Sequence, residues 1–349
     1  MDLIKVLVVD DSPVVQNVLS EIISSDARLK VVGVAADPYE AREKIKLLNP
    51  DVLTLDIEMP RMDGITFLSK LMRLRPMPVV MISTLTEKGA PATLQALELG
   101  AVDFLAKPQV SSGTDLKDYT EVIIEKIIMA SQCNVQALAA ENEHEFEPSE
   151  KIKPNQQVKA GLICAIGAST GGTEAIKEVL LRMPVDGPPV VLAQHIPAVF
   201  STSYAKRLDD NCDVKVFEAE DGQAIEPGCA YLAPGDKHLK IKKVGGSYRC
   251  VLDDGELVNR HKPSVEVLFD SVREVAGKNA VGVMLTGMGA DGSEALLRMR
   301  EAGCETIAQD EATSVVWGMP GVAVKLGGAS QVLPLWNVAK AIMSIATKK

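Results

Sequence analysis

The sequence has few aromatic residues, no excess of basic residues and no clustered cysteines. Only 4% of its 349 residues are Phe, Trp or Tyr, and 37 Lys and Arg stand against 47 Asp and Glu, giving a formal net charge of −10. Because nucleic-acid interfaces usually present a basic face, we expect no nucleic-acid partner. The six cysteines form no Cys-x-x-Cys pair, which excludes a clustered zinc or redox motif and fits reduced thiols in the cytoplasm.

Long apolar runs are also missing. The longest run without a charge, residues 187–205, contains three prolines together with Gln194 and His195, so we expect no transmembrane segment. The first residues, Met1-Asp-Leu-Ile-Lys5, lack a basic stretch followed by an apolar region, and no secretory signal peptide is evident. A chain of this length is expected to form two domains of roughly 100–200 residues each.

Short apolar strands alternate with helical patterns in the first part of the chain. The predicted strands are 4–9, 31–35, 52–55, 79–82 and 102–105, and the predicted helices are 14–24, 39–48, 65–74, 90–99 and 119–130. Near-continuous apolar strands separated by helices indicate a parallel sheet that is covered on both faces. We therefore predict a flavodoxin-like (βα)5 domain over residues 1–130.

The composition then changes sharply. Five of the ten residues 141–150 are Glu and none is basic, which favours a helical and acidic linker over 131–158. The βα alternation resumes with predicted strands at 162–166, 190–193 and 281–285 and helices at 173–181 and 293–302. Residues 215–259 are rich in Gly and Asp, so hairpins are expected there. Residues 159–349 are thus predicted to form a doubly wound α/β domain with a β-hairpin insertion.

Polar side chains end four of the five N-terminal strands. Asp10 and Asp11 end the first strand, Asp56 the third, Ser83 the fourth and Lys107 the fifth. The carboxyl ends of parallel strands face one crevice, where three carboxylates would repel one another unless a cation is bound. Oxygen ligands of this kind suit Mg²⁺. Asp56 could then act as a nucleophile toward a phosphoryl group, with the Lys107 and Ser83 side chains balancing its charge.

A second group of side chains follows three strands of the C-terminal domain. Ser169 lies in Gly167-Ala-Ser-Thr-Gly-Gly172, with the spacing of a nucleophile elbow, although glycines at such a junction are often only turn residues. His195 follows the next strand, and Asp291 follows the strand 281–285. Three strand ends would bring together a nucleophile, a base and a carboxylate. Asp291 could instead cap the helix that begins at Ser293.

The other three histidines are weaker candidates for the base. His144 lies in the acidic linker, and His238 and His261 lie in loop-like segments. The order Ser, His, Asp differs from the order Ser, Asp, His of the α/β-hydrolases, which indicates a different fold with the same chemistry.

A dinucleotide site is a competing interpretation of the last glycine cluster. Gly287, Gly289 and Gly292 have the dinucleotide spacing, and Asp310 lies near the place of a ribose-binding acid. Only 57 residues follow Gly292 (349 − 292), too few for a full dinucleotide fold. This interpretation also leaves Ser169 and His195 unexplained.

The N-terminal motifs resemble those of the response-regulator receiver domain. These motifs are Val-Val-Asp10-Asp11-Ser-Pro, Leu-Asp56-Ile-Glu-Met-Pro60, Asp63-Gly64, Ser83 and Lys107-Pro108. The resemblance implies that Asp56 accepts a phosphoryl group from a histidine kinase, while Asp10, Asp11 and Asp56 hold Mg²⁺. It also implies that Phe104 is the aromatic switch residue.

The C-terminal motifs resemble those of the chemotaxis protein-glutamate methylesterase family, the CheB family, whose pattern covers nearly the whole chain. The motifs are Ile166-Gly-Ala-Ser-Thr-Gly-Gly172, Gln194-His195-Ile-Pro197, Ala233-Pro-Gly-Asp-Lys-His238, Asn259-Arg-His-Lys-Pro-Ser264 and Leu285-Thr-Gly-Met-Gly-Ala-Asp-Gly292. The resemblance assigns the catalytic triad to Ser169, His195 and Asp291, with Thr170 and Met288 as active-site neighbours. No cofactor is implied for the esterase chemistry.

This resemblance also implies a substrate and a form of control. It implies hydrolysis of glutamate γ-methyl esters, with release of methanol, and deamidation of glutamines, both on methyl-accepting chemoreceptors in the cytoplasm. A chemotaxis histidine kinase is the implied phosphodonor, and phosphorylation of Asp56 is expected to activate the esterase. Two alternatives remain: a second domain that only binds a partner or nucleotide, and a serine hydrolase acting on another ester.

Overall fold

The computed structural model describes residues 3–83, 89–107, 115–135, 152–153 and 157–347. The chain divides into two compact units, Met1–Glu143 and His144–Lys349, each with its own sheets. Most of the predicted linker, 131–158, lies outside the described residues, so the proposed boundaries at 130 and 159 stay predictions.

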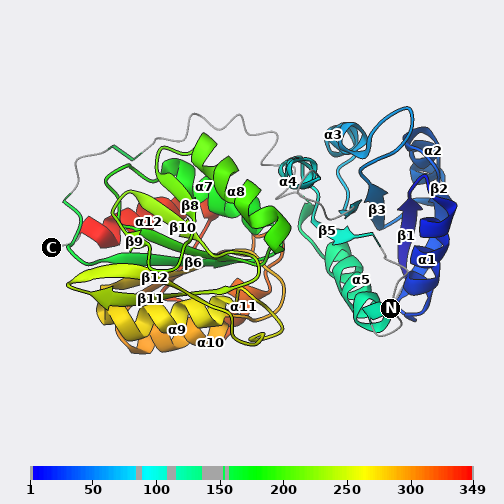
Figure 1. Ribbon diagram of the computed structural model, residues 1–349. Helices are drawn as coiled ribbons and strands as arrows, with labels where there is room; N and C mark the ends of the chain where they lie inside the picture. The colour runs from blue at the N-terminus through cyan, green and yellow to red at the C-terminus, as the bar shows by residue number, and fades with distance from the viewer. Residues whose placement is uncertain (1–2, 84–88, 108–114, 136–151, 154–156, 348–349) are drawn as a thin grey trace. The chain divides into compact units, whose positions relative to one another are not determined.

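The first unit is a five-stranded parallel sheet with the order β2-β1-β3-β4-β5. Its strands are β1 (Ile4–Val9), β2 (Leu29–Ala35), β3 (Val52–Asp56), β4 (Val79–Ser83) and β5 (Asp103–Ala106). Its helices are α1 (Pro13–Ser24), α2 (Pro38–Leu48), α3 (Gly64–Leu74), α4 (Ala90–Glu98) and α5 (Asp115–Ser131). Helices α1 and α5 pack together on one face, and α3 and α4 pack on the other (Figure 1). This confirms the predicted (βα)5 fold.

Local capping signals set the starts of these helices. Ser12 precedes Pro13, and its hydroxyl accepts a hydrogen bond from Val15 N at 3.5 Å. The Asp63 carboxylate likewise accepts one from Thr66 N at 2.7 Å and starts α3. The strands β3 and β4 are buried along their whole length, because helices cover both of their faces.

The second unit is built on a seven-stranded parallel sheet with the order β15-β14-β13-β6-β7-β10-β8. The strands that carry the predicted site are β6 (Ile163–Ala168), β7 (Val190–Gln194) and β13 (Ala280–Met284). The others are β8 (Lys215–Glu218), β10 (Cys229–Leu232), β14 (Glu305–Gln309) and β15 (Gln331–Leu333). The chain leaves β6 toward β7 and later returns to β13 on its other side. The carboxyl ends of these three strands therefore form a topological switch point.

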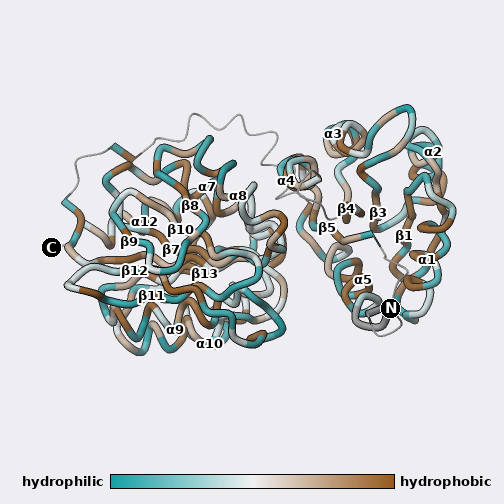
Figure 2. The backbone as a smooth tube through the Cα atoms, in the orientation of Figure 1, coloured by the Kyte–Doolittle hydropathy of each residue, from teal (hydrophilic) through white to brown (hydrophobic). Residues whose placement is uncertain are grey.

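Two layers of helices cover this sheet (Figure 1). The helices α7 (Gly172–Arg182), α8 (Ala198–Asn211) and α12 (Leu335–Thr347) lie on one face. The other face carries α9 (Val265–Ala276), α10 (Ser293–Glu301) and α11 (Met319–Lys325), and the short 3-10 helix Gly277–Asn279 follows α9. Hydrophobic residues concentrate in the central strands and in the helix faces turned toward them (Figure 2). The predicted doubly wound α/β fold is confirmed.

The region 215–259 forms two kinds of structure. A hairpin of β11 (His238–Val244) and β12 (Ser247–Asp253) joins β9 (Ala224–Ile225) in a separate antiparallel sheet, as expected for an insertion. The strands β8 and β10 are instead parallel members of the main sheet. β10 pairs with β7, a partner distant in the sequence, and β8 then pairs with β10 in parallel rather than as a hairpin, which local turn signals do not indicate.

No helix in the described part of the chain combines the length and apolarity needed to cross a bilayer. Of the cysteines, Cys133, Cys164, Cys229, Cys250 and Cys304 are free thiols.

Candidate functional site

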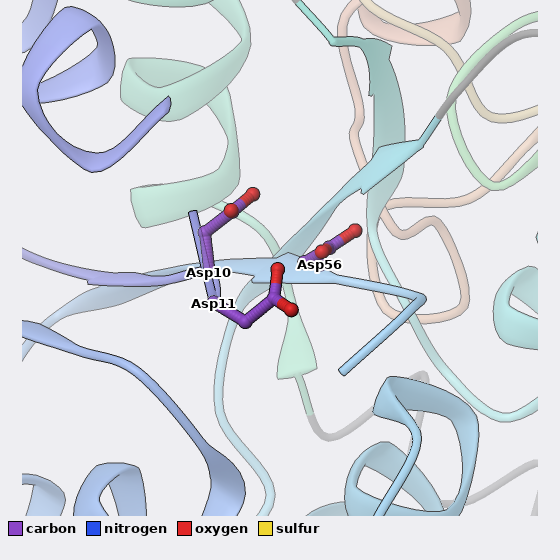
Figure 3. A group of neighbouring side chains, drawn as sticks. All are labelled: Asp10, Asp11 and Asp56. Atoms are coloured by element: carbon purple, nitrogen blue, oxygen red, sulfur yellow. The ribbon is translucent and has the colours of Figure 1, made fainter. Parts of the chain in front are cut away.

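The carboxylates of Asp10, Asp11 and Asp56 gather at the carboxyl ends of β1 and β3 (Figure 3). One oxygen of each lies within 4.8 Å of an oxygen of the others. Asp10 and Asp56 are buried, whereas Asp11 is exposed at the rim. The topology thus brings together the three carboxylates that the sequence placed at strand ends.

Lys107 supplies a positive charge to this acidic pocket. Its Nζ donates a hydrogen bond to Asp56 Oδ2 at 2.7 Å and lies 3.4 Å from Asp10 Oδ2. Burial outweighs the lysine and raises the pKa of Asp56 to about 6. The buried Asp56 carboxylate therefore binds a proton more readily than a carboxylate in water.

The donor set of the acidic pocket fits a divalent cation. Asp10 Oδ2 is buried, and although the Lys107 ammonium lies 3.4 Å away, no described residue donates a hydrogen bond to it. A buried oxygen without a donor is costly unless a cation or water completes its coordination. Three carboxylate groups within reach of one point suit the hard, oxygen-preferring Mg²⁺.

Ser83 and Phe104 lie on the neighbouring strands β4 and β5. The Ser83 side chain is buried at the end of β4, where Thr93 Oγ1 lies 3.3 Å from its hydroxyl. Phe104 is buried, with the Lys126 ammonium 5.3 Å from its ring centroid. Ser83 thus ends its strand as the sequence predicted, whereas the switch role of Phe104 stays a prediction.

Ser169 follows the last residue of β6 at the topological switch point. Its N–H donates to Thr286 O at 3.0 Å, and its carbonyl accepts from Gln194 Nε2 at 2.8 Å. The turn closes where Gly172 N donates to Ser169 O at 2.7 Å, and Gly171 adopts the left-handed conformation with φ +74°. A glycine rather than the serine therefore takes the unfavourable dihedral of this turn. Ser169 itself stays partly exposed.

His195 lies beside Ser169 because β6 and β7 are paired in register. Ala168 pairs with Gln194, and His195 N donates to Ala168 O at 3.2 Å. His195 Nε2 lies 2.9 Å from Asp291 Oδ2, and both side chains are largely buried. The other ring nitrogen, Nδ1, is buried without a hydrogen-bond partner among the described residues. A neutral ring that donates from Nε2 to the carboxylate keeps a lone pair on Nδ1.

The Asp291 carboxylate is held by the segment that leads into α9. It accepts hydrogen bonds from Val265 N at 2.7 Å, Ser264 Oγ at 2.8 Å and Asn259 Nδ2 at 2.8 Å. Burial alone would raise its pKa, but the hydrogen bonds from His195, Asn259 and Ser264 lower the pKa of Asp291 to about 2. Asp291 is therefore a fixed anion next to the His195 ring.

The suggestion that Asp291 caps its own helix is wrong. Gly292 is the N-cap of α10, and the Asp291 carboxylate lies at the N-terminus of α9 instead. The carboxylate is thus turned toward His195 rather than along its own helix.

Thr170 and Met288, the predicted active-site neighbours, lie on the two loops that flank Ser169. The Thr170 carbonyl accepts from Thr286 Oγ1 at 3.0 Å, which ties the serine loop to the loop after β13. Met288 is partly exposed and follows Gly287. A Cβ at Gly287 would lie only 2.8 Å from Ser169 Cβ and 3.0 Å from Ser169 N. Only a glycine lets the two loops approach so closely.

The dinucleotide interpretation of this loop does not fit its surroundings. Gly287 packs on Ser169, and the Asp310 carboxylate accepts hydrogen bonds from the backbone and hydroxyl of Thr313. The Asp310 carboxylate, which a dinucleotide site would use to bind a ribose, thus makes hydrogen bonds within its own turn instead.

Sequence reasoning gave no role to three residues of this site. Gln194 fixes the Ser169 carbonyl, and Asn259 and Ser264 hold the Asp291 carboxylate. Gln194 precedes His195 on the strand, and the other two lie in the motif Asn259-Arg-His-Lys-Pro-Ser264. That motif could have drawn attention to Asn259 and Ser264, but their contacts with the Asp291 carboxylate depend on the tertiary fold.

Comparisons with known proteins agree with this architecture. The family model "CheB methylesterase" matches residues 164–342, and the model "Response regulator receiver domain" matches residues 6–117. A protein-glutamate methylesterase/protein-glutamine glutaminase of Saccharophagus degradans is 60% identical over 99% of both chains. One from Xanthomonas oryzae pv. oryzae is 54% identical over 99% of this chain and 98% of its own.

A solved structure resembles the second unit. The CheB methylesterase catalytic domain of Thermotoga maritima is 36% identical, with a TM-score of 0.52, and covers 54% of this chain and all of its own. Together with the two family models and the full-length relatives, this likeness shows that the chain belongs to the CheB methylesterase family, with a response regulator receiver domain preceding the methylesterase domain.

Proposed function

We propose that this protein is a phosphorylation-activated serine hydrolase that demethylates glutamate γ-methyl esters and deamidates glutamines on methyl-accepting chemoreceptors. The observation that carries the proposal is the His195–Asp291 pair, placed beside Ser169 at three adjacent strand ends. The relatives named as protein-glutamate methylesterase/protein-glutamine glutaminase support the substrate class.

Ser169 Oγ attacks the γ-carbonyl carbon of the substrate side chain. His195 accepts the serine proton, and Nδ1 is the ring nitrogen whose lone pair is available for it. As the tetrahedral species collapses, the C–O or C–N bond breaks and His195 returns the proton to methanol or ammonia. Water then repeats the sequence on the acyl-serine and releases a glutamate side chain.

Asp291 and the backbone support the charges that develop in these steps. The Asp291 anion fixes the orientation of His195 and stabilises its imidazolium. The N-cap of α7, Gly171, has no side chain that could accept from the first amides of that helix. The N–H groups of Ser169 and Gly172 already donate to carbonyl groups, so the oxyanion hole is assigned to N–H groups between them and in the Met288 loop. Both reactions are acyl transfers at a γ-carbonyl, so one triad serves both.

The receiver domain supplies the control. An Asp56 carboxylate oxygen attacks the phosphorus of a histidine kinase phosphohistidine, and the P–N bond breaks. Lys107 balances the charge of the product. Asp10, Asp11 and Asp56 would hold Mg²⁺, which neutralises phosphoryl oxygens when bound. Phosphorylation adds about two negative charges at this edge of the sheet and raises the esterase activity. The receptor substrate and the cysteine thiols favour a cytoplasmic location.

The experiment is methanol release from methylated receptor membranes, with and without a small phosphodonor and Mg²⁺. We expect release that rises with the phosphodonor and falls at least ~10³-fold in Ser169→Ala, whose fold should survive. Near-normal release by a well-folded Ser169→Ala protein would reject the nucleophile. Acylation of Ser169 without release from any receptor preparation would indicate another ester substrate, and loss of acylation would favour a binding domain.

A further inference from the structure

A tight turn after β12 lies next to the proposed triad. Val258 N donates to His261 O at 3.1 Å, and His261 N donates to Val258 O at 2.9 Å. The two residues between them, Asn259 and Arg260, have φ values of +53° and +68°. A two-residue connection with positive φ at both positions is the signature of a type I′ turn. A long side chain such as that of Arg260 is costly at positive φ and is kept where the fold requires this geometry.

The turn contacts two members of the triad at once. Asn259 Nδ2 donates to Asp291 Oδ1 at 2.8 Å. The His261 ring stacks on the His195 ring, with 3.7 Å between the centroids and 10° between the planes. The closed pair of backbone hydrogen bonds fixes the distance between these two contacts.

The stacked ring restricts a motion that the hydrogen bond to Asp291 leaves open. That bond holds His195 at one atom, Nε2, whereas the ring can still tilt out of its plane about this point. The lone pair on Nδ1 lies in the ring plane, so a tilt turns it away from the serine proton. Catalytic groups must keep their productive geometry to within about 10–20°, and a parallel ring on one face opposes the tilt.

We propose that His261 is a positioning residue that holds the His195 imidazole in the plane required for proton transfer with Ser169. It acts by its flat face rather than by exchanging protons with the substrate. The inference rests on the proposed function, because it assigns His261 a part in the same triad.

The contact itself can be tested without any substrate. Stacked rings shift each other's C–H protons upfield in NMR spectra. In the full-length protein, His261→Ala should move the His195 Cε1 and Cδ2 protons downfield, and His261→Phe should keep them upfield. Unchanged His195 signals in a folded His261→Ala protein would show that the rings do not stack and would overturn the inference.

Activity then tests the positioning role. We expect His261→Ala to lower kcat for methanol release about tenfold or more, with KM changed less than about twofold. His261→Phe should remain within about threefold of the unsubstituted protein. His261→Leu fills similar space without a flat face, and should resemble the alanine variant. Thermal unfolding of each variant separates these effects from loss of fold.

The neighbouring Lys262 offers a matched control. Its side chain pairs with the exposed Asp254 at 3.0 Å, and Lys262→Ala should keep kcat within about twofold. Normal turnover by folded His261→Ala, or equal losses in the alanine and phenylalanine variants, would overturn the positioning role alone. An unsubstituted protein that neither releases methanol nor acylates Ser169 would instead overturn the proposed function, and the positioning role with it.

Discussion

Asp291 caps a helix to which it does not belong: its Oδ2 accepts a hydrogen bond from Val265 N, the first residue of α9, at 2.7 Å. The same oxygen lies 2.9 Å from His195 Nε2. The positive end of the α9 dipole and the imidazole thus share one carboxylate. A change at Asp291 therefore affects both the proposed chemistry and the stability of the fold.

Replacing Asp291 with Asn separates its charge from its shape. Asp291→Asn keeps an oxygen acceptor but loses the anion, so the neutral His195 ring is no longer held in the required tautomer. We expect methanol release to fall ~10³–10⁴-fold. Asp310 also follows a strand of the main sheet, but in the contacts described its carboxylate accepts hydrogen bonds from Thr313 of its own turn and not from His195. Asp310→Asn is the control and should keep its activity; equal activity of the two variants would contradict the assignment.

The stability of the protein should depend on pH through Asp291. Its pKa in the folded protein is about 2, below the ordinary value of 3.8. The folded state thus holds this proton less tightly, and the stabilisation is complete above pH 3.8 and disappears as pH falls through 2. The difference between these two pKa values corresponds to about 2 kcal/mol of free energy of unfolding. Urea unfolding of the unsubstituted protein and Asp291→Asn between pH 6 and 2 should show the gap between them closing as pH falls. A gap that is constant with pH would disprove the linkage.

The close approach of Gly287 to Ser169 should make this glycine irreplaceable. In Gly287→Ala, the new Cβ would lie 2.8 Å from Ser169 Cβ and 3.0 Å from its backbone N. Since the backbone at Ser169 cannot move freely, the serine is displaced. We expect activity to fall about 10²-fold and the free energy of unfolding to drop by about 1–3 kcal/mol.

Gly255 provides the comparison for this substitution. A Cβ there would meet the Asp253 carboxylate at 3.3 Å, the end of a side chain that can move away. Gly255→Ala should therefore retain most of its activity. Unimpaired turnover by Gly287→Ala would show that Ser169 tolerates the displacement.

Activation by a phosphodonor should require the Asp56 carboxylate. In Asp56→Asn the attacking oxygen is lost, so methanol release should no longer rise with the phosphodonor, and chelation of Mg²⁺ by EDTA should remove the rise in the unsubstituted protein. Asp51, whose carboxylate accepts from Lys5 N just before β3, is the control, and Asp51→Asn should still respond. Stimulation that persists in Asp56→Asn would place the phosphoryl acceptor elsewhere.

Much of the fold could be predicted because it follows from local patterns. The β3 residues 52–56 are apolar apart from Thr54 and Asp56 and buried, as a run covered on both faces requires. The parallel β8 and β10 could not be predicted in this way. Their short sequences resemble hairpin strands, whereas β8 and β10 pair in parallel and β10 joins β7, a partner distant in the sequence.

In the candidate site too, some features follow from local patterns in the sequence and others depend on the tertiary fold. Ser169, His195 and Asp291 each follow a predicted strand, so the topology of a parallel sheet was enough to place them together. The contact of His261 with His195 depends on a turn in which Asn259 and Arg260 both have positive φ values. No local sequence rule predicts positive φ at these two residues. The catalytic roles of the three strand-end residues stay predictions until the variants are measured.

The order of the strands in the main sheet has a consequence for the protein while it is being synthesised. Strand β6, which precedes Ser169, pairs with β13, which precedes Asp291, although β7, β8, β10 and the insertion lie between them in the sequence. A chain emerging from the ribosome therefore contains Ser169 and His195 long before Asp291 has been synthesised. The three side chains can therefore come together only after most of the domain has been translated, because β13 takes its place beside β6 late in synthesis.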